Sequence, residues 1–388
     1  MTQVNSASHT ARQRFWATEL PLLRPAMLVG RTGHAYPFPF NDPNVEYVHF
    51  ARNAIYVLAQ QLGLTGADVL MPAYFHGVEL EALLAAGVRP RFFPVRSGMR
   101  VDPDDIRSLI SADTRAIYLT HYLGFPGPVK ALRELCDKRG LILIEDCALA
   151  LLSRVGDEWL GSFGDAAVFC LYKTLPTPDG GAAVVKHGRL RFQGVTPQLS
   201  GTARETAVAL LQGIEYGGGG LGLLARSARA VCRALSRQTR SNWVDVGTQH
   251  FNSADAQLAI SPVSQRIVSA QDYENIARTR RTNYLHLEHL LRDISPPVFP
   301  ALPEGVCPLF YPFATQRKLE LWTKLCSRGV QTVMFWNPTP LGPAPGEFPE
   351  VDTLRQTILE LPCHQDMTPQ RIERVAQAVR VAVRELGT

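Results

Sequence analysis

The chain has 388 residues, 46% of them hydrophobic, and a formal net charge of +5 at pH 7. This length suffices for one large and one smaller domain, and the weak charge, though compatible with an anionic substrate, does not indicate nucleic-acid binding. The seven cysteines lack the spacing of a disulfide framework or a zinc site, and we recognise neither a signal peptide nor a membrane span. We therefore expect a cytoplasmic globular protein that contacts no membrane.

The segment between residues 45 and 186 alternates short apolar runs with segments of helical period, which is typical of β-α units and a mainly parallel sheet. Several of the helices carry a clear start or stop signal, such as the Asp-Pro pair at 102–103 or Gly140. Helices are predicted at residues 53–62, 77–86, 102–110 and 129–139, and strands at residues 69–71, 91–95, 116–120 and 141–144.

The last of these strands is fully apolar and runs directly into Glu145 and Asp146. Open α/β sheets bind their ligands at the carboxyl ends of parallel strands. Asp146 is therefore a candidate site residue on its position alone. The alternative, which the local pattern leaves open, is a carboxylate that caps the following helix.

After residue 186 the pattern loosens, and Gly, Thr and Pro punctuate residues 187–220. The glycine run 217–220 predicts a flexible crossing, followed by an amphipathic helix at residues 221–238. One face of this helix is apolar and the other is basic, with Leu221, Leu224, Ala228, Val231 and Leu235 on the first and Arg226, Arg229, Arg233, Arg237 and Arg240 on the second. The arginines predict a solvated basic face. A surface for an anionic substrate or an acidic carrier is the alternative.

A long helix at residues 269–291 leads into a C-terminal α+β region that ends in a helix at residues 369–386. Before this region, Lys173 follows the apolar run 166–172 and precedes a proline-containing loop that closes on Gly180 and Gly181. A lysine at the edge of a core is partly desolvated, which lowers its pKa and makes the neutral amine available for Schiff-base chemistry. It can equally extend its ammonium group to water at a strand end.

The stretch from residue 45 to residue 185 resembles the DegT/StrS-type family of aminotransferases, which depend on pyridoxal 5'-phosphate (PLP) and act mostly on nucleotide-linked keto-sugars. The motifs that carry the resemblance are Leu143-Ile144-Glu145-Asp146-Cys147-Ala148, Gly164-Asp165-Ala166-Ala167-Val168-Phe169, Asp179-Gly180-Gly181, His121-Tyr122-Leu123-Gly124, and, towards the C-terminus, Arg328-Gly329-Val330 and Leu361-Pro362-Cys363-His364-Gln365-Asp366.

The resemblance implies the α/β fold of fold-type-I PLP-dependent transferases. A large PLP-binding domain with a mostly parallel seven-stranded sheet would span residues 1–265, with an N-terminal arm and a variable insert at 190–250, and a smaller C-terminal α+β domain would span residues 266–388. It also implies a homodimer in which each active site is completed by the neighbouring chain. The implied partners are a small-molecule keto substrate and an amino donor.

Carried over residue by residue, the resemblance gives Lys173 the covalent bond to PLP and the movement of protons between substrate and cofactor carbons. Asp146 would bond the pyridine nitrogen and keep it protonated, so that the ring can accept electrons. His76 falls where the family stacks an aromatic ring on the cofactor, and Tyr74 or Phe75 are the alternatives.

The phosphate of the cofactor would lie at the start of the first helix. Ala51, Arg52 and Asn53 occupy the position of the family's phosphate-binding turn, where backbone N–H groups bind phosphate whatever the side chains. Arg52 would add a charged contact or point to solvent. Cys170 stands near the position of the usual phosphate-binding serine.

Three departures from the family bear on the reaction. Leu149 replaces a glutamine that contacts the phenolic oxygen of the cofactor, the Lys173 loop is shorter, and the region that supplies the sugar-nucleotide site is replaced by the glycine run and the basic helix. We expect an aminotransferase. The alternatives are a PLP-dependent elimination, substitution or condensation, and a non-catalytic PLP-fold protein that binds a ligand or regulates a partner. Because Lys173 is retained, the family's sugar-dehydratase variant is disfavoured.

Overall fold

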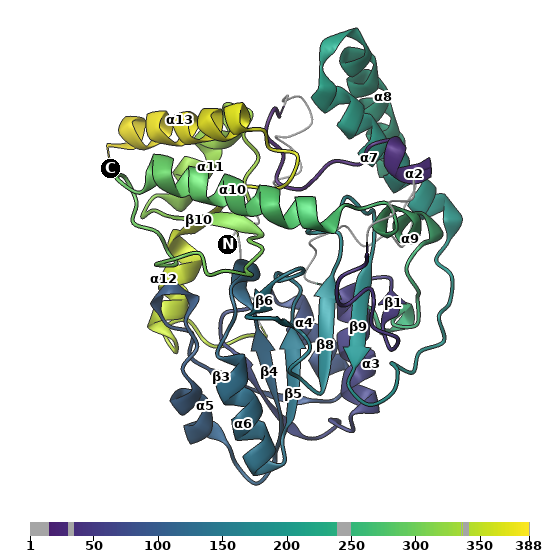
Figure 1. The fold of residues 1–388 in the computed structure, drawn as a ribbon, viewed down its shortest axis with the longest axis vertical. Coiled ribbons are helices and arrows are strands. Elements are labelled where there is room, and N and C mark those ends of the chain that lie inside the picture. The colour runs from purple at the N-terminus through teal and green to yellow at the C-terminus, as the bar shows by residue number, and fades with distance from the viewer. Residues whose placement is uncertain (1–14, 30–34, 239–249, 335, 337–340, 388) are drawn as a thin grey trace.

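The computed structural model describes residues 15–29, 35–238, 250–334, 336 and 341–387. A seven-stranded sheet forms the centre of its larger part, in the order β1-β9-β8-β5-β4-β2-β3 (Figure 1). Its strands are β1 (Glu46–Val48), β2 (Asp68–Pro72), β3 (Arg89–Phe93), β4 (Thr114–Thr120), β5 (Ile142–Asp146), β8 (Ala166–Cys170) and β9 (Gly181–Val185).

Most of the neighbouring strands in this sheet are parallel. β2 pairs in parallel with β3 and β4, β4 with β5, and β5 with β8, whereas β9 is antiparallel to β8 and to β1. Parallel strands need crossover connections; helices supply them here except between β5 and β8, which are joined by the segment that contains β6 and β7. The expected α/β class with a mostly parallel seven-stranded sheet is confirmed.

Helices cover both faces of the sheet, so alternate residues of a strand enter different hydrophobic clusters. Leu70, Ile117 and Leu143 pack in one cluster, and their neighbours Met71 and Tyr118 pack in the other. The crossover helices are α3 (Ala51–Gln61), α4 (Val78–Ala85), α5 (Pro103–Leu109) and α6 (Val129–Arg139). Burial on both faces explains why these strands are apolar throughout.

A second, smaller assembly follows in the chain and lies above the sheet in Figure 1. Its two strands, β10 (Phe310–Ala314) and β11 (Ile358–Pro362), pair in antiparallel fashion. Its helices are α10 (Tyr273–Leu291), α11 (Lys318–Ser327), α12 (Pro349–Thr357) and α13 (Pro369–Leu386). The smaller elements are α2 (Ala26–Val29), α9 (Pro262–Val268), the hairpin of β6 (Arg154–Val155) and β7 (Glu158–Trp159), and 3-10 turns at Ser97–Met99, Tyr122–Gly124 and Ser253–Asp255.

The predicted irregular segment at residues 187–220 is wrong in its second half, which forms helix α7 (Leu199–Gly217). The glycine run is the tight connection from α7 to α8 (Gly219–Gln238) rather than a long crossing, and the two helices pack against each other. Gly213, inside α7, has a packing reason, because a Cβ on it would lie 2.2 Å from the carbonyl oxygen of Leu23. The N-terminal segment therefore packs directly on the backbone of α7.

The predicted solvated basic face of α8 is also wrong where the structure describes it. Arg229 is hydrogen-bonded to the buried carboxylate of Glu215 on α7, and the side chain of Arg226 lies 4.0 Å from the same carboxylate. The apolar side of α8 is exposed instead, with Leu221 74% and Leu224 70% accessible. The side chains of Arg233 and Arg237, and the whole of Arg240, lie outside the described part of the chain. The buried carboxylate of Glu215 thus draws Arg226 and Arg229 towards α7.

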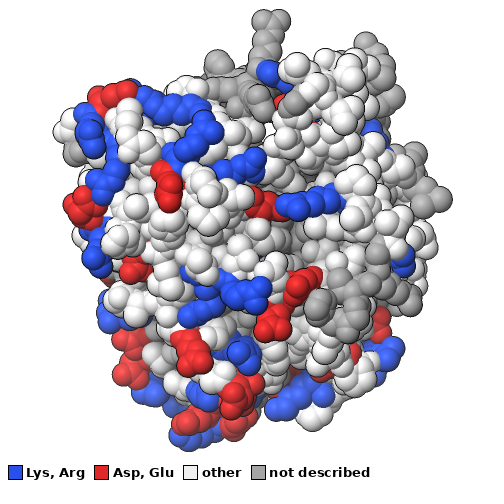
Figure 2. All heavy atoms as spheres, turned by 45° about the horizontal axis from the view of Figure 1, so that its top comes forward, with Lys and Arg blue, Asp and Glu red and all other residues white. Residues whose placement is uncertain are grey.

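Acidic and basic side chains are interspersed over the face drawn in Figure 2, so the basic excess does not gather there in a single patch. Most element boundaries lie within two residues of their predictions; β3, for example, begins two residues early, at Arg89, and the long helix at 269–291 is α10 preceded by the separate helix α9. The predicted domain boundary at residue 265 falls within α9, and the two-domain division stays a prediction. No helix of the described residues could cross a membrane.

Candidate active site

A cavity of about 180 Å³ lies at the carboxyl ends of β4, β5 and β8. Lys173 and Asp146 both line it, although 27 residues separate them in the chain. Its wall also contains five residues contributed by other elements, namely Ala51, Arg52, His76, Leu149 and Cys170. Six of the seven predicted site residues therefore meet in one cavity, at the end of the sheet where ligands of this fold class bind.

Asp146 is the last residue of β5 and is buried. Its side-chain Oδ1 accepts a hydrogen bond from the backbone N–H of Ala148 (2.9 Å), and its carbonyl oxygen accepts one from the N–H of His121 (3.0 Å). Burial, followed by the nearby Glu79 carboxylate, raises the pKa of Asp146 to about 6, and the Lys173 ammonium opposes that rise. The surroundings of Asp146 thus bring its pKa nearer to neutral pH, a perturbation that is common at functional sites.

The loop that carries Lys173 is held by the C-terminal part of the chain. The carbonyl oxygen of Thr174 accepts hydrogen bonds from the guanidinium of Arg280 (3.2 Å) and from the amide of Gln365 (3.0 Å). Arg280 is 1% exposed and also donates to the carbonyl oxygens of Pro308 and Leu309. This buried guanidinium fixes the backbone directly after Lys173, so the amine can be presented from a rigid loop.

The first turn of α3 forms another wall of the cavity through Ala51 and Arg52. A Cβ on Gly181 of β9 would lie 2.5 Å from the backbone nitrogen of Ala51, so only a glycine lets the strand approach the helix start so closely. The guanidinium of Arg52 donates to the carbonyl oxygen of His250 (3.1 Å) and lies 4.6 Å from the centre of the Phe50 ring. Arg52 therefore faces the site rather than solvent, beside helix N–H groups that favour an anion.

Two of the residues predicted near the phosphate occupy different surroundings. Cys170 lines the cavity, and burial raises the pKa of its thiol, which keeps it neutral. Asn53 is not among the lining residues: its side chain donates to the carbonyl oxygen of Asp255, and its N–H bonds to the carbonyl oxygen of Phe50. Asn53 thus ties α3 to the 3-10 turn at Ser253–Asp255.

Of the three candidate stacking residues, only His76 lines the cavity. Tyr74 is buried against Trp336, with ring centres 4.7 Å apart, and Phe75 stacks on Phe92 at 5.4 Å. These two aromatic rings therefore belong to the core. Among these three candidates, His76 is therefore the one whose flat ring can contact a ligand in the cavity.

Glu79 is a site residue that the sequence did not reveal. It is 6% exposed, lines the cavity, and accepts hydrogen bonds from the backbone N–H groups of His76 (2.8 Å) and Gly77 (3.1 Å). An acidic residue in the first turn of a helix usually caps that helix, which is the only signal the sequence carried. Here the cap also shapes the His76 loop and adds negative charge beside Asp146.

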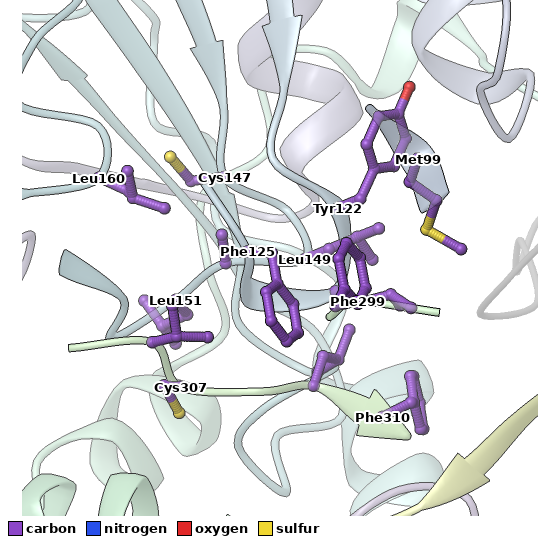
Figure 3. Close-up of a cluster of buried hydrophobic side chains, with 14 of the residues drawn as sticks. Met99, Tyr122, Phe125, Cys147, Leu149, Leu151, Leu160, Phe299, Cys307 and Phe310 are labelled. Atoms are coloured by element: carbon purple, nitrogen blue, oxygen red, sulfur yellow. The ribbon is translucent and has the colours of Figure 1, made fainter. Parts of the chain in front are cut away.

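Leu149 is 2% exposed and belongs both to the cavity wall and to the hydrophobic core. Figure 3 shows it among the side chains of Tyr122, Phe125 and Phe299. A glutamine at this position would bury a polar amide among aromatic rings, which is unfavourable without partners. The apolar side chains around residue 149 therefore suit the leucine that stands in place of the family's glutamine.

Below the cavity, Glu145 and His121 form a fully buried pair. The Glu145 carboxylate accepts hydrogen bonds from the backbone N–H groups of Gly161 (2.8 Å) and Gly164 (2.6 Å) and from His121 Nε2 (3.0 Å). His121 Nδ1 accepts a hydrogen bond from the N–H of Gly127 (3.0 Å), so the ring proton resides on Nε2. This network joins the ends of β4 and β5 directly beneath Asp146.

Replacing Glu145 by glutamine is expected to lower the free energy of unfolding by about 2 to 4 kcal/mol, because a buried amide NH₂ would then face an N–H donor. Denaturant unfolding of the cofactor-free protein measures this change. The matched control is Glu158→Gln at an exposed carboxylate that pairs with Lys130, where we expect less than about 0.5 kcal/mol. Equal effects of the two substitutions would contradict the proposed network.

Comparison with known proteins agrees with this geometry. The model of the DegT/DnrJ/EryC1/StrS aminotransferase family matches residues 50–214. A dTDP-4-dehydro-2,3,6-trideoxy-D-glucose 4-aminotransferase of Saccharopolyspora spinosa is 29% identical over 357 residues, which is 88% of this chain and 85% of that protein. A dTDP-3-amino-3,4,6-trideoxy-alpha-D-glucose transaminase of Streptomyces venezuelae is 26% identical and covers 86% of this chain and 81% of its own.

Solved structures share the fold. The aminotransferase TlmJ from Streptoalloteichus hindustanus superposes with a TM-score of 0.64 at 23% identity, covering 89% of this chain and 87% of its own. Helicobacter pylori PseC, an aminotransferase involved in the biosynthesis of pseudoaminic acid, reaches a TM-score of 0.68 at 17% identity, covering 95% and 99%. The family match over residues 50–214, the two long alignments and the shared fold make the chain similar to members of the DegT/DnrJ/EryC1/StrS aminotransferase family.

Proposed function

We propose that this enzyme is a PLP-dependent aminotransferase that moves an amino group from an amino-acid donor to a keto-sugar. The observation that carries the proposal is the joint placement of Lys173 and Asp146 in one cavity, beside the first turn of α3. The relatives from Saccharopolyspora spinosa and Streptomyces venezuelae, whose names denote amino transfer on dTDP-linked sugars, support this substrate class.

The residues of the cavity fit PLP in charge and shape. The N–H groups at the start of α3 and the guanidinium of Arg52 suit a phosphate, and the neutral Cys170 thiol beside them adds no repulsion. The Asp146 carboxylate suits a protonated pyridine nitrogen, since an opposite charge restores its ionisation. The imidazole of His76 offers a flat surface for the ring.

PLP supplies an electron sink that stabilises negative charge developing on a substrate carbon. In our proposal the amine of Lys173 would hold the cofactor covalently, and the same amine would be the base that moves a proton at the substrate α-carbon. The Asp146 carboxylate would hold the pyridine nitrogen in its protonated form by opposite charge. Arg280 and Gln365 hold the Lys173 loop still, so the amine stays within reach of that carbon.

The experiment that tests amino transfer is the half-reaction of the PLP-loaded protein with L-glutamate. We expect the absorbance of the bound cofactor to change to that of pyridoxamine phosphate, with one equivalent of 2-oxoglutarate released per active site. Chromatography of the released cofactor distinguishes the two forms. If no amino acid from a panel of donors converts the cofactor, amino transfer is ruled out. Release of a keto acid while the cofactor stays in the PLP form would instead indicate an elimination.

We also propose that the enzyme acts as a homodimer in the cytoplasm. None of the seven cysteines, all of which lie in the described part of the chain, forms a disulfide, which supports a reducing compartment. The exposed leucines of α8 form an apolar surface of the kind that protein interfaces cover, which supports association.

A further inference from the structure

The loop that leads to His76 is held by a side chain that enters from the smaller assembly. Arg355 belongs to α12, and its guanidinium donates to the carbonyl oxygens of Ala73 (3.1 Å) and Phe75 (3.2 Å). The same guanidinium lies 5.5 Å from the centre of the Tyr74 ring and 5.5 Å from that of the Phe75 ring, within the range of a cation–π contact. Since 280 residues separate Arg355 from Phe75 in the chain, only the complete fold provides these contacts.

Other side chains bond the backbone of the same loop. The carbonyl oxygen of Tyr74 accepts a hydrogen bond from the hydroxyl of Tyr122 (2.7 Å). The Glu79 carboxylate accepts one from the N–H of His76 (2.8 Å). Burial lowers the pKa of Arg355, and Glu79 is among the groups that oppose this lowering. The loop is thus held by two opposite charges, a guanidinium at its carbonyl oxygens and a carboxylate at its N–H groups, and such charge-assisted hydrogen bonds are strong.

Arg355 also holds a second segment of the cavity wall. Its guanidinium donates to the carbonyl oxygen of Trp336 (2.7 Å), a residue that is 4% exposed and lines the cavity, as His76 does. The ring of Trp336 packs against that of Tyr74. Arg355 is not among the described residues that line the cavity, so it acts on a ligand there through the segments that it holds. One guanidinium therefore ties the position of the imidazole to the smaller assembly.

We propose that Arg355 is a positioning residue for the cofactor, which fixes the loop that presents the His76 imidazole and joins this loop to the Trp336 segment. The inference rests on the proposed binding of PLP at Lys173 and adds a distant residue to that site. A ring that is fixed before the cofactor arrives loses little conformational freedom on binding, so the cofactor binds more tightly. Without the guanidinium, part of the contact between imidazole and cofactor is spent on ordering the loop.

A double-substitution cycle between Arg355 and His76 tests this role, with cofactor-free protein titrated with PLP and the absorbance of the bound form followed. Arg355→Met is expected to weaken PLP binding about tenfold, because the hydrogen bonds to the loop are lost. In the His76→Ala background the same substitution should change binding less than about twofold, because the ring through which Arg355 acts is absent. Arg355→Lys keeps the charge but lacks the planar fork that bonds several carbonyl oxygens at once, so it should weaken binding about threefold.

Hydrogen exchange of the cofactor-free protein provides a second measurement. The peptide that contains His76 and Gly77 should exchange at least about fivefold faster in Arg355→Met than in the unsubstituted protein, because the loop opens more often. The matched control is Arg266→Met. The guanidinium of Arg266 also bonds two backbone carbonyl oxygens, those of Leu28 (3.2 Å) and Val29 (2.8 Å), but away from the cavity. This control should leave both the exchange and the affinity for PLP unchanged.

Equal weakening of PLP binding by Arg355→Met in the two backgrounds would overturn the proposal, since Arg355 would then act independently of His76. Unchanged affinity and unchanged exchange would overturn it as well. Should Arg355→Met fail to fold, Arg355→Lys is carried through the same cycle with the same two outcomes. Neither measurement requires turnover, so failure of the glutamate half-reaction would remove amino transfer and leave the role of Arg355 standing. The two failures are therefore distinguishable.

Discussion

Replacing Lys173 by alanine is expected to abolish the covalent attachment of PLP, because the described residues that line the cavity include no second lysine. Treating the PLP-loaded protein with borohydride makes such an attachment permanent, and peptide mass spectrometry then locates it. In the unsubstituted enzyme the cofactor mass should appear on the peptide that contains Lys173. Amino transfer by the variant should fall by at least about 10³-fold, as for removal of other nucleophilic or proton-transferring groups.

Lys186 provides the matched control for this substitution. It is an exposed lysine that follows β9, on the same stretch of chain but away from the cavity. Lys186→Ala should keep the attachment and the half-reaction with glutamate. A Lys173→Ala protein that still retains borohydride-fixed cofactor on another lysine would refute the assignment of the site.

Replacing Asp146 by asparagine is expected to lower amino transfer about 10²- to 10³-fold, the loss seen when a preorganised electrostatic partner of a reacting group is removed. Asparagine can still accept the hydrogen bond from the N–H of Ala148, so the backbone should keep its course. What it cannot do is hold a proton on the pyridine nitrogen by opposite charge. Rates of the glutamate half-reaction measure the effect.

The same substitution should stabilise the cofactor-free protein at neutral pH. The pKa of Asp146 is raised in the fold from 3.8 to about 6, so between these values the folded state binds more protons than the unfolded state. The carboxyl therefore lowers the free energy of unfolding progressively as the pH rises through this window. A pKa that is raised by roughly two units corresponds to about 3 kcal/mol of lost stability above pH 6. Asparagine carries no charge, so the variant does not suffer this loss.

Denaturant unfolding of the two cofactor-free proteins checks this expectation. The variant should exceed the unsubstituted protein by about 2 to 3 kcal/mol at pH 8 and by little at pH 4. Asp157→Asn, at an exposed carboxylate, should stay within about 0.5 kcal/mol at both pH values. A variant that is less stable at pH 8 would show that Asp146 serves the fold rather than the site.

Much of the sheet and its helices could be predicted from the sequence, because local signals and burial agree there. Helices α6 (Val129–Arg139) and α13 (Pro369–Leu386) match their predicted bounds. Each ends in a glycine with a left-handed backbone, Gly140 and Gly387, the first of which was predicted as a stop signal. The prediction that Lys173 and Asp146 lie in one site came from the family motifs that contain them, which lie at the ends of neighbouring strands of this sheet.

Helix α7 was not predicted because glycines usually interrupt a helix, and the sequence does not show which segment packs against them. Gly213 is required by the close approach of Leu23, a contact between segments 190 residues apart. The arginines of α8 were misplaced for a related reason: a pattern of charge shows which face is polar but not that Glu215 lies buried beside it. Contacts between segments that are distant in the sequence determine both the course of α7 and the orientation of these arginines. The periodicity of the sequence does not reveal such contacts.

Residues of the cavity that come from distant segments were missed for the same cause. Glu19 belongs to the N-terminal segment, and Phe310 and Trp336 belong to the smaller C-terminal assembly. Nothing in their local sequence distinguishes them from ordinary core or surface positions. Glu79 differs, since its place in the first turn of α4 pointed to a cap, and only the fold brings that cap beside Asp146.

The hydrogen bonds from Arg280 and Gln365 to the Lys173 loop bear on when the cofactor can bind during synthesis of the chain. Both side chains hold the carbonyl of Thr174, from positions 106 and 191 residues further along the chain. A nascent chain that has just completed its central sheet therefore still lacks the groups that fix this loop. We expect the cofactor to be captured only after translation has nearly finished, when the last strand and helix have docked.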